Sequence, residues 1–257
     1  MENKEKLDKF DIVIPVGPND EGVIDEQIKY TKKNIIGYRN IYIVPSNPEI
    51  EIDGCITVNE DIFPFSKQSL NEYRNSGQRV GWYLAQLIKL YAGKVIPNIL
   101  ETYLVIDADT FFIKPTTFID NNKCMYSQGM EYQGAYFEHM KKMHPSLKKP
   151  HDVGRTKSGI CHHMMFQVDY FDKLVKLVED YHGKPFYEMW IKCINERSLH
   201  HAGAADYEIY YNFMMDQYRD KIIERKLAFT NVPNIQFDPN DYQNCDFVSC
   251  HHYCRRK

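Results

Sequence analysis

Apolar runs and helical periodicity alternate along the first third of the chain. Residues 12–16 form a short apolar run followed by the turn sequence Gly-Pro-Asn-Asp, which predicts a strand and a turn. Residues 24–35 carry Ile, Ile, Thr and Ile three or four positions apart, as on one face of a helix. Apolar runs at 41–44 and 55–58 predict two further strands. Strand, helix and strand in this order form a βαβ unit, which implies a parallel sheet with a right-handed crossover.

The middle of the chain predicts a helix that leads into a buried strand. After a polar stretch at 61–78, apolar residues at helical spacing predict a helix over 80–93, which we expect to end at Gly93. Residues 103–106, Tyr-Leu-Val-Ile, form an unbroken apolar run of the kind found in strands that are covered on both faces. We therefore expect this strand to lie centrally in the sheet, with Asp107-Ala108-Asp109 at its carboxyl end.

The second half is less regular but contains the same kinds of element. Strands are expected at 123–127, 162–168, 226–232 and 246–250, helices at 171–181 and 206–218, and loop with one short helix at 130–158. The tyrosines of the last helix recur at helical spacing, which predicts core packing rather than stacking on sugar rings. Because repeats and linkers are absent from the sequence, we expect one α/β domain over 1–257, with a mixed, mostly parallel sheet flanked by helices and with 1–9 as a flexible extension.

Charge and composition exclude several classes of protein. The formal net charge of −3 argues against a general nucleic-acid-binding protein, because such proteins carry a basic excess. The first nine residues are highly charged, and no apolar run approaches the roughly 18 residues that span a bilayer. We therefore expect neither a signal peptide nor a transmembrane anchor, and a cytoplasmic protein. The seven cysteines are scattered and form no Cys-x-x-Cys pair, which favours reduced thiols.

Asp107 and Asp109 are the first candidates for chemistry. Ligands of open α/β sheets bind outside the carboxyl ends of the strands, where we expect this pair to lie. Two carboxylates held close together repel each other, and a divalent cation such as Mg²⁺ or Mn²⁺ removes that penalty and bridges to substrate phosphates. The competing interpretation is a simple turn. The apolar strand before the pair, and Phe-Phe and Lys-Pro after it, favour the metal site.

Several segments, in order along the chain, resemble known families. Residues 103–115, Tyr-Leu-Val-Ile-Asp-Ala-Asp-Thr-Phe-Phe-Ile-Lys-Pro, resemble the Asp-x-Asp segment of GT-A glycosyltransferases. Five others resemble the DUF6492 family, a group proposed to be glycosyltransferases: Asp11-Ile-Val-Ile-Pro-Val, Phe63-Pro-Phe, Gly81-Trp-Tyr-Leu-Ala-Gln-Leu-Ile-Lys-Leu, His162-His163-Met-Met-Phe and Ala205-Asp-Tyr-Glu-Ile-Tyr. The resemblance covers most of residues 10–252. The last motif is usually Ser-Glu-Tyr-Glu in this family, so Ala205-Asp206 is a departure that shortens the first carboxylate by one methylene.

This resemblance implies a GT-A (Rossmann-like) fold that takes a hexose from a nucleotide-sugar, expected to be a UDP-sugar, and transfers it to a hydroxyl of a glycan or protein. It implies that Asp109 ligates the metal ion directly, while Asp107 contacts the ribose of the nucleotide or a metal-bound water. GT-A enzymes often complete the metal shell with a histidine near the C-terminus, and His251 and His252 both match that place. An imidazole ligand favours Mn²⁺ over Mg²⁺. The competing interpretation of the two histidines is a solvated tail, and a Cys/His zinc site there fits no common spacing.

The donor pocket has two candidate parts. The resemblance makes the turn after the first strand the floor of the nucleotide pocket, with backbone groups of Pro15 and Val16 at the base. Arg79, Gln86 and Lys89 share one face of the helix expected over 80–93, together with a tryptophan at position 82. Guanidinium and ammonium groups suit phosphate oxygens, so this stripe is a candidate for holding the diphosphate. The simpler interpretations are a tight turn and a solvated helix face.

Asp206 and Glu208 are candidates for the general base that takes the proton of the acceptor hydroxyl. They open the last helix, where the positive end of the helix dipole keeps a carboxylate ionised. Two residues apart on a helix they point about 200° apart, so at most one faces the sugar. The resemblance favours Asp206, with Glu208 second, and the competing interpretation of Asp206 is a helix N-cap. His162 and His163 begin a strand, so one is expected to face inward, either to bind sugar or acceptor or as a core histidine.

Two other functions use the same residues. A metal-dependent nucleotidyltransferase or nucleotide-sugar hydrolase also needs paired carboxylates, but the Gly-rich phosphate loop that it usually carries is not in the sequence. A non-catalytic nucleotide-sugar binding protein would bind the metal and the nucleotide without turnover.

Overall fold

The central sheet is built mainly from the apolar runs of the first half of the chain. The computed structural model describes residues 9–149 and 157–255. The strands lie in the order β10 (His163–Gln167), β5 (Thr102–Ile106), β1 (Phe10–Val16), β3 (Tyr38–Pro45) and β4 (Ile56–Thr57). Neighbouring strands are parallel except for β10, which runs antiparallel to β5. β1 and β5 are buried along almost their whole length, which explains why apolar residues follow one another in both.

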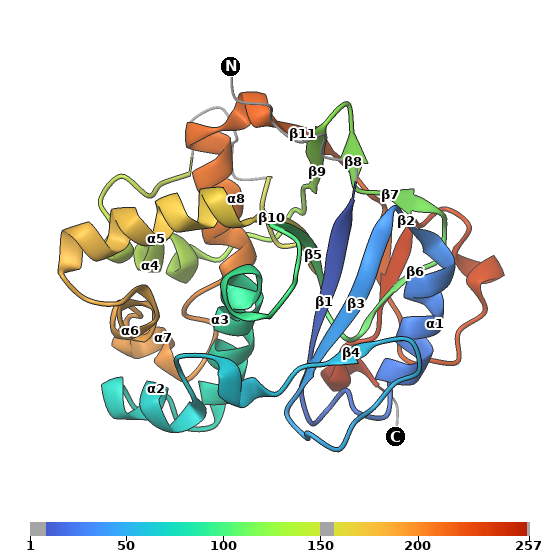
Figure 1. The fold of residues 1–257 in the computed structure, drawn as a ribbon, viewed down its shortest axis with the longest axis horizontal. Helices are drawn as coiled ribbons and strands as arrows, with labels where there is room; N and C mark the ends of the chain where they lie inside the picture. Colours follow the sequence, from blue (N-terminus) through green and yellow to red (C-terminus); the bar gives the residue numbers. More distant parts are fainter. Residues whose placement is uncertain (1–8, 150–156, 256–257) are drawn as a thin grey trace.

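Helices flank this sheet on two sides (Figure 1). On one side lies α1 (Ile24–Asn34), and on the other lie α3 (Val80–Val95), α5 (Val168–His182) and α8 (Asp206–Gln217). The second group is completed by α2 (Lys67–Tyr73), α4 (Gly134–Met143), α6 (Phe186–Lys192) and α7 (Glu196–Leu199). The predicted fold class, a mixed and mostly parallel sheet flanked by helices, is therefore confirmed.

β5 ends just before Asp107, and the chain turns there into a second sheet. The amide of Thr110 donates to the carbonyl oxygen of Asp107 at 3.0 Å, which closes the turn. The second sheet has the order β12 (Phe229–Asn231), β13 (Phe247–Ser249) and β6 (Thr110–Phe112). The pair Asp107 and Asp109 therefore lies at the junction of two sheets, and β13 brings the C-terminal segment beside it. Five short strands form two smaller sheets: β8 (Ile119–Asp120), β9 (Lys123–Ser127) and β11 (Ile222–Arg225), and β2 (Ile35–Ile36) with β7 (Thr116–Thr117).

α8 is buried on nearly all sides. Its first ten residues are all buried, and only its last turn reaches solvent. Tyr207, Tyr210 and Tyr211 are core residues, so the predicted packing role is confirmed for these three. A buried helix places the two carboxylates of its first turn, Asp206 and Glu208, inside the protein rather than in solvent.

Two helices in the first half of the chain differ from the prediction. The polar stretch at 61–78 contains α2, whose first turn is closed by a capping box between Ser66 and Ser69. α3 does not end at Gly93 but continues to Val95. A Cβ on this glycine would lie 2.5 Å from the ring of Tyr103 and 2.6 Å from Val168, so the glycine is needed for close packing of the helix and not to end it.

Three expectations concern the chain as a whole. None of the helices in the described residues combines the length and the apolar character needed to cross a bilayer. All seven cysteines are free. Of the predicted N-terminal extension, residues 1–8 lie outside the described residues.

Candidate active site

Asp107 is held by three side chains from different parts of the chain. Its Oδ1 accepts hydrogen bonds from Nζ of Lys89 at 2.5 Å and from the hydroxyl of Tyr207 at 2.7 Å. Its Oδ2 lies 3.5 Å from Nδ1 of His162. Burial raises the pKa of Asp107, but Lys89 and His162 together hold it well below its ordinary value. Asp107 is therefore ionised at neutral pH.

Asp109 pairs with His251. Nδ1 of His251 lies 2.9 Å from Oδ2 of Asp109, and the amide of Cys250 donates to the carbonyl oxygen of Asp109 at 2.8 Å. Burial lowers the pKa of His251, but the hydrogen bond and the charge of Asp109 raise it above its ordinary value. Of the two histidines predicted as metal ligands, His251 is beside Asp109, whereas the side chain of His252 is exposed.

Lys89 joins the strand tip to the start of α8. Its Nζ lies 2.5 Å from Oδ1 of Asp107 and 3.7 Å from Oδ2 of Asp206. It also lies 4.4 Å from the centre of the Tyr207 ring, in a cation–π arrangement. Burial lowers the pKa of Lys89, but the two carboxylates raise it above its ordinary value, so the ammonium stays charged inside the protein.

The predicted stripe on α3 faces the segment that precedes α8. Nε of Arg79 donates to the carbonyl oxygen of His201 at 2.8 Å, and Nε2 of Gln86 donates to that of Ala204 at 3.3 Å. Gln86 is buried, and the side chain of Lys89 is only 12% exposed. A solvated helix face therefore does not describe this stripe.

Asp206 is a buried carboxylate with a raised pKa. It is 4% exposed, and its Oδ2 has no hydrogen-bond partner within the described part of the chain. Burial raises the pKa of Asp206 to about 6, although Lys89 opposes the rise, and the nearby charge of Asp107 adds to it. A carboxyl group that exchanges its proton near neutral pH is suited to general acid–base catalysis.

Glu208 has different surroundings, as its position two residues further along the helix predicts. It is 1% exposed, and both of its oxygens accept hydrogen bonds. Oε2 accepts from the hydroxyl of Ser158 at 2.5 Å and from the amide of Gly159 at 3.1 Å, and Oε1 accepts from Asn212 at 2.7 Å.

The two adjacent histidines lie in different environments. His163 packs among Phe112 and Phe247 and bonds to the hydroxyl of Ser127 at 2.8 Å, and burial lowers its pKa to about 3. It therefore occupies the position of a core histidine. His162 has a left-handed backbone with φ of 62° and lies beside Asp107, with its ring centre 4.8 Å from that of His251. A non-glycine residue in this backbone region is uncommon and marks a local constraint at the site.

The turn after β1 lies beside the acidic pair. Pro15 and Val16 end β1, which is parallel to β5, so the following turn and Asp109 lie at the same edge of the sheet. Burial raises the pKa of Asp20, and the negative charge of Asp109 raises it further. Asp20 is in turn paired with Arg255, whose Nη2 lies 2.5 Å from its Oδ1.

Four residues of this arrangement were not predicted from the sequence. Tyr207 lies between the two predicted carboxylates of α8, and Asp20 is the last residue of the predicted Gly-Pro-Asn-Asp turn, so position alone was a signal for both. Ser158 and Arg255 reach the site through tertiary contacts with Glu208 and Asp20, and the sequence contains no local signal for either.

The described side chains provide part of the ligand set that a divalent ion needs. Within residues 9–149 and 157–255, no group of three or more His, Cys, Asp or Glu side chains is arranged as a complete metal site. Asp109 and His251, each with a side chain 13% exposed, offer one carboxylate oxygen and one imidazole nitrogen 2.9 Å apart. This donor pair suits Mn²⁺ better than Mg²⁺, and an ion held by two protein ligands leaves positions for substrate oxygens.

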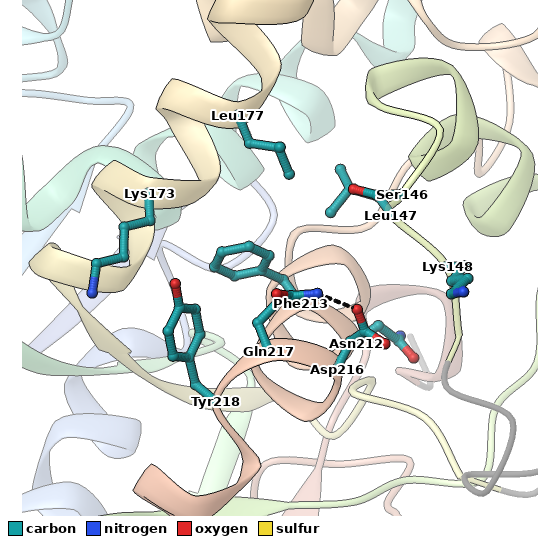
Figure 2. Close-up of a pocket in the computed structure, with 10 residues that line it drawn as sticks. All are labelled: Ser146, Leu147, Lys148, Lys173, Leu177, Asn212, Phe213, Asp216, Gln217 and Tyr218. Carbon is teal, nitrogen blue, oxygen red and sulfur yellow. Dashed lines mark hydrogen bonds between the residues drawn. The ribbon is translucent and has the colours of Figure 1, made fainter.

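A cavity of about 350 Å³ lies elsewhere, at the C-terminal end of α8 (Figure 2). Its lining includes Lys173, Phe213 and Tyr218, and it contains none of the predicted site residues. The acidic site at the strand tip is therefore distinct from this cavity.

The fold and these residues define an α/β protein with an acidic site at the tip of a central parallel strand. A family model described as a family of unknown function (DUF6492) matches residues 4–228, and the chain belongs to this family. The match ends before β13 and His251. No curated protein matches the chain. Among solved structures, mouse xyloside xylosyltransferase 1 in its apo form aligns with a TM-score of 0.46 and 8% identity, over 97% of this chain and 100% of that chain. This likeness is too weak to assign an activity.

Proposed function

We propose that this protein is a metal-dependent glycosyltransferase of the GT-A type. It transfers a hexose from a nucleotide-sugar, with a UDP-sugar as the expected donor, to a hydroxyl group of a glycan or protein. One observation supports this proposal most: a strand-tip pair of carboxylates is joined through Lys89 to a buried carboxyl group whose pKa is raised to about 6. Sugar transfer needs charged groups beside the departing phosphate and a base for the proton of the acceptor, and these must lie close together.

The donor side of the proposed site comprises Asp109, His251 and Asp107. Asp109 and His251 would hold Mn²⁺, or Mg²⁺, which supplies positive charge to the diphosphate leaving group when it is bound. Asp107 is ionised, and Lys89 and Tyr207 hold its Oδ1; its Oδ2, 3.5 Å from His162, would contact the ribose or a water molecule. The β1 turn at Pro15 and Val16, with Arg79 and Gln86 on α3, would complete the donor pocket.

The acceptor side contains Asp206, for which we propose the role of general base. The acceptor oxygen forms a bond to the anomeric carbon of the sugar, and its proton passes to a carboxylate oxygen of Asp206. The bond between the anomeric carbon and the phosphate oxygen breaks, and the nucleoside diphosphate leaves with the electron pair. His162 lies beside Asp107 and would contact the sugar, whereas His163 is buried in the core, which does not favour such a role.

The test is acceptor-dependent release of nucleotide. The protein is incubated with Mn²⁺ and a panel of nucleotide-sugars, with and without a mixed pool of glycan and peptide acceptors, and with EDTA as the metal-free control. We expect free nucleoside diphosphate to form only with acceptor and metal present. Formation of sugar-1-phosphate would instead indicate a hydrolase or nucleotidyltransferase. Metal-dependent binding of UDP without turnover in any acceptor pool would indicate a binding protein.

A further inference from the structure

Three successive residues at the start of α8 contact three different parts of the site. Asp206 lies beside Lys89 of α3, and the hydroxyl of Tyr207 donates to Asp107 at the tip of β5. Glu208 contacts neither of these. It accepts hydrogen bonds from the segment 158–162, which leads into β10.

The contacts of Glu208 use both of its carboxylate oxygens. Oε2 accepts from Ser158 and Gly159, and Oε1 accepts from Nδ2 of Asn212, which also donates to the backbone oxygen of Glu208 at 2.8 Å. Because both of its acceptors lie on the Glu208 side, the amide of Asn212 has a fixed orientation, and its Oδ1 is buried without a partner in the described residues. Asn212 is also one of the residues around the cavity in Figure 2. Oε2 therefore accepts two hydrogen bonds and Oε1 one, so both oxygens of Glu208 are engaged by groups of the protein.

The segment 158–162 packs closely against α8 on one side and against Gly129, just after β9, on the other. A Cβ on Gly159 would lie 2.5 Å from the carbonyl oxygen of Tyr207, and a Cβ on Gly129 would overlap the carbonyl oxygen of Ile160. Ser158 also forms a backbone bridge with Gly129. Since neither side leaves room for a methyl group, the path of this segment is set by contacts on both of its sides.

The segment ends at a strained residue of the site. His162 has a left-handed backbone, and its carbonyl oxygen accepts a hydrogen bond from the amide of Asp107 at 2.9 Å. Its imidazole lies 3.5 Å from Asp107 and next to the ring of His251. A left-handed non-glycine residue persists only where surrounding contacts hold it there.

We infer that Glu208 is a positioning residue: it fixes the segment 158–162 so that His162 stays within the site. This role rests on the proposed function and leaves Asp206 as the group that takes the acceptor proton. The carboxylate of Glu208 acts through its hydrogen bonds, and not through its charge or its basicity toward substrate.

A pair of substitutions at one position separates these roles. In Glu208→Gln, the amide oxygen still accepts from Ser158 and Gly159, and Asn212 can turn its amide so that the unpartnered Oδ1 accepts from the new NH₂ group. The hydrogen bonds to Ser158 and Gly159 are kept and the base is lost. In Glu208→Ala, both the hydrogen bonds and the base are lost.

We expect the glutamine variant to keep kcat within about tenfold of the wild type, and the alanine variant to lose about 100-fold, because a small displacement of a site residue has an effect of that size. The glutamine variant should keep the affinity for UDP and Mn²⁺, since Glu208 does not touch Asp109 or His251, and in the alanine variant this affinity should fall less than kcat. Hydrogen exchange of the amides of 159–162 should speed up in the alanine variant only. A glutamine variant as inactive as the alanine variant, with those amides still protected, would show that Glu208 is itself the base and overturn the inference.

Variants of the segment cover the case in which Glu208→Ala fails to fold. Ser158→Ala removes the donor at 2.5 Å, and Gly159→Ala places a methyl group against α8. Both should lower kcat more than they lower the affinity for UDP and Mn²⁺. Gly134→Ala is the matched control, because a Cβ there meets nothing within 4 Å. Wild-type kcat in both segment variants would overturn the inference. If no acceptor supports transfer, the proposed function fails, and the exchange of amides 159–162 in the two Glu208 variants still decides whether Glu208 fixes the segment.

Discussion

Asp107 and Asp109 are two residues apart in the sequence but have separate sets of partners. Asp107 is surrounded by donors, namely Lys89, Tyr207 and His162, and this leaves little need for a further cation. Asp109 has the imidazole of His251 at 2.9 Å, a group that can itself be a metal ligand. We therefore expect different roles for the two carboxylates: Asp107 would contact the ribose or a water molecule, and Asp109 would bind the ion.

The first prediction concerns metal-dependent nucleotide affinity. Asp109→Ala should abolish the gain in UDP affinity that Mn²⁺ provides, because it removes the carboxylate that lies within hydrogen-bond distance of His251. His251→Ala should weaken that gain by about tenfold to 100-fold, the range for loss of a metal-site partner. Isothermal titration calorimetry of UDP with Mn²⁺ and with EDTA measures both effects. His252→Ala is the matched control and should bind as the wild type does. An unchanged Mn²⁺ effect in Asp109→Ala would contradict the metal assignment.

The raised pKa of Asp206 predicts how activity depends on pH. A general base works in its ionised form, so kcat should fall as the pH drops below about 6, the pKa of this group. Asp206→Asn should lower kcat by about 10² to 10⁴-fold, the usual contribution of a positioned base, and should remove this acid limb from whatever activity remains. Asp216→Asn, an exposed carboxylate on the same helix, is the control. A kcat profile of the wild type that is flat between pH 5 and 8 would contradict the role of Asp206.

The same pKa shift predicts a gain in stability for the inactive variant. Because the pKa of Asp206 is higher in the folded protein than in the unfolded chain, this group contributes most to stability below its unfolded pKa, and that contribution is lost as the pH rises through about 6. Above this pH the ionised group costs up to about 3 kcal/mol. Asp206→Asn removes the charge, so it should stabilise the protein at pH 8 and have little effect at pH 4. Urea unfolding at both pH values measures the difference. Lower stability at pH 8 would instead make Asp206 a structural counter-ion of Lys89.

At the scale of elements, the close contact of α3 with the sheet depends on one glycine. Gly93→Ala should destabilise the fold by about 1–3 kcal/mol, because the new methyl group overlaps Tyr103 and Val168 and overpacking has an effect of this size. The midpoint of urea unfolding measures the change, with Gly134→Ala as the control in open space. Since Lys89 lies one turn earlier on α3, the variant should also lower kcat if the helix shifts. A midpoint equal to that of the wild type would mean that the helix adjusts without strain.

The elements that could be predicted from the sequence are those whose own residues specify them. β1, β3 and β5 contain the predicted apolar runs, and α5 includes the helix predicted over 171–181. α2 was missed because its stability comes from a capping box and not from apolar periodicity. β6 and β11 were missed because they are only three and four residues long, and their strand character comes from pairing with distant segments.

The same distinction holds for the candidate site. Asp107, Asp109 and Lys89 were predicted because each lies at a place that local pattern defines, namely a strand end or a helix face. Which residues contact one another was not predictable, because Ser158 and Glu208 are 50 residues apart and His251 and Asp109 are 142 apart. Such pairs are brought together by sheet order and helix packing, and no local pattern encodes them.

At the scale of the whole molecule, the C-terminal segment contacts the turn after β1 and the end of β5 at the same site. Arg255 pairs with Asp20 and also donates to the carbonyl oxygen of Cys250, whose own amide bonds to Asp109. The segment after β13 is therefore tied to the β1 turn on one side and to the strand tip on the other. A ligand bound at Asp109 and His251 should therefore stabilise the contacts of the segment after β13 together with the rest of the fold.

Truncation after Cys250 tests that connection. The shortened chain keeps β13 and loses two pairs, His251 with Asp109 and Arg255 with Asp20, each worth about 1 kcal/mol or less, so it should melt within several degrees of the full chain. UDP with Mn²⁺ at 100 times its Kd should stabilise the full chain by about 2.7 kcal/mol. At the same concentrations the truncated chain should gain only about 0.4–1.4 kcal/mol, because loss of His251 weakens binding by about tenfold to 100-fold. Thermal melting with and without ligand measures both chains, and Arg197→Ala, which removes an exposed arginine paired with Glu138, is the control. Equal stabilisation of the full and truncated chains would place the nucleotide away from the C-terminal segment, and the contact between Asp109 and His251 would then be a feature of the fold alone.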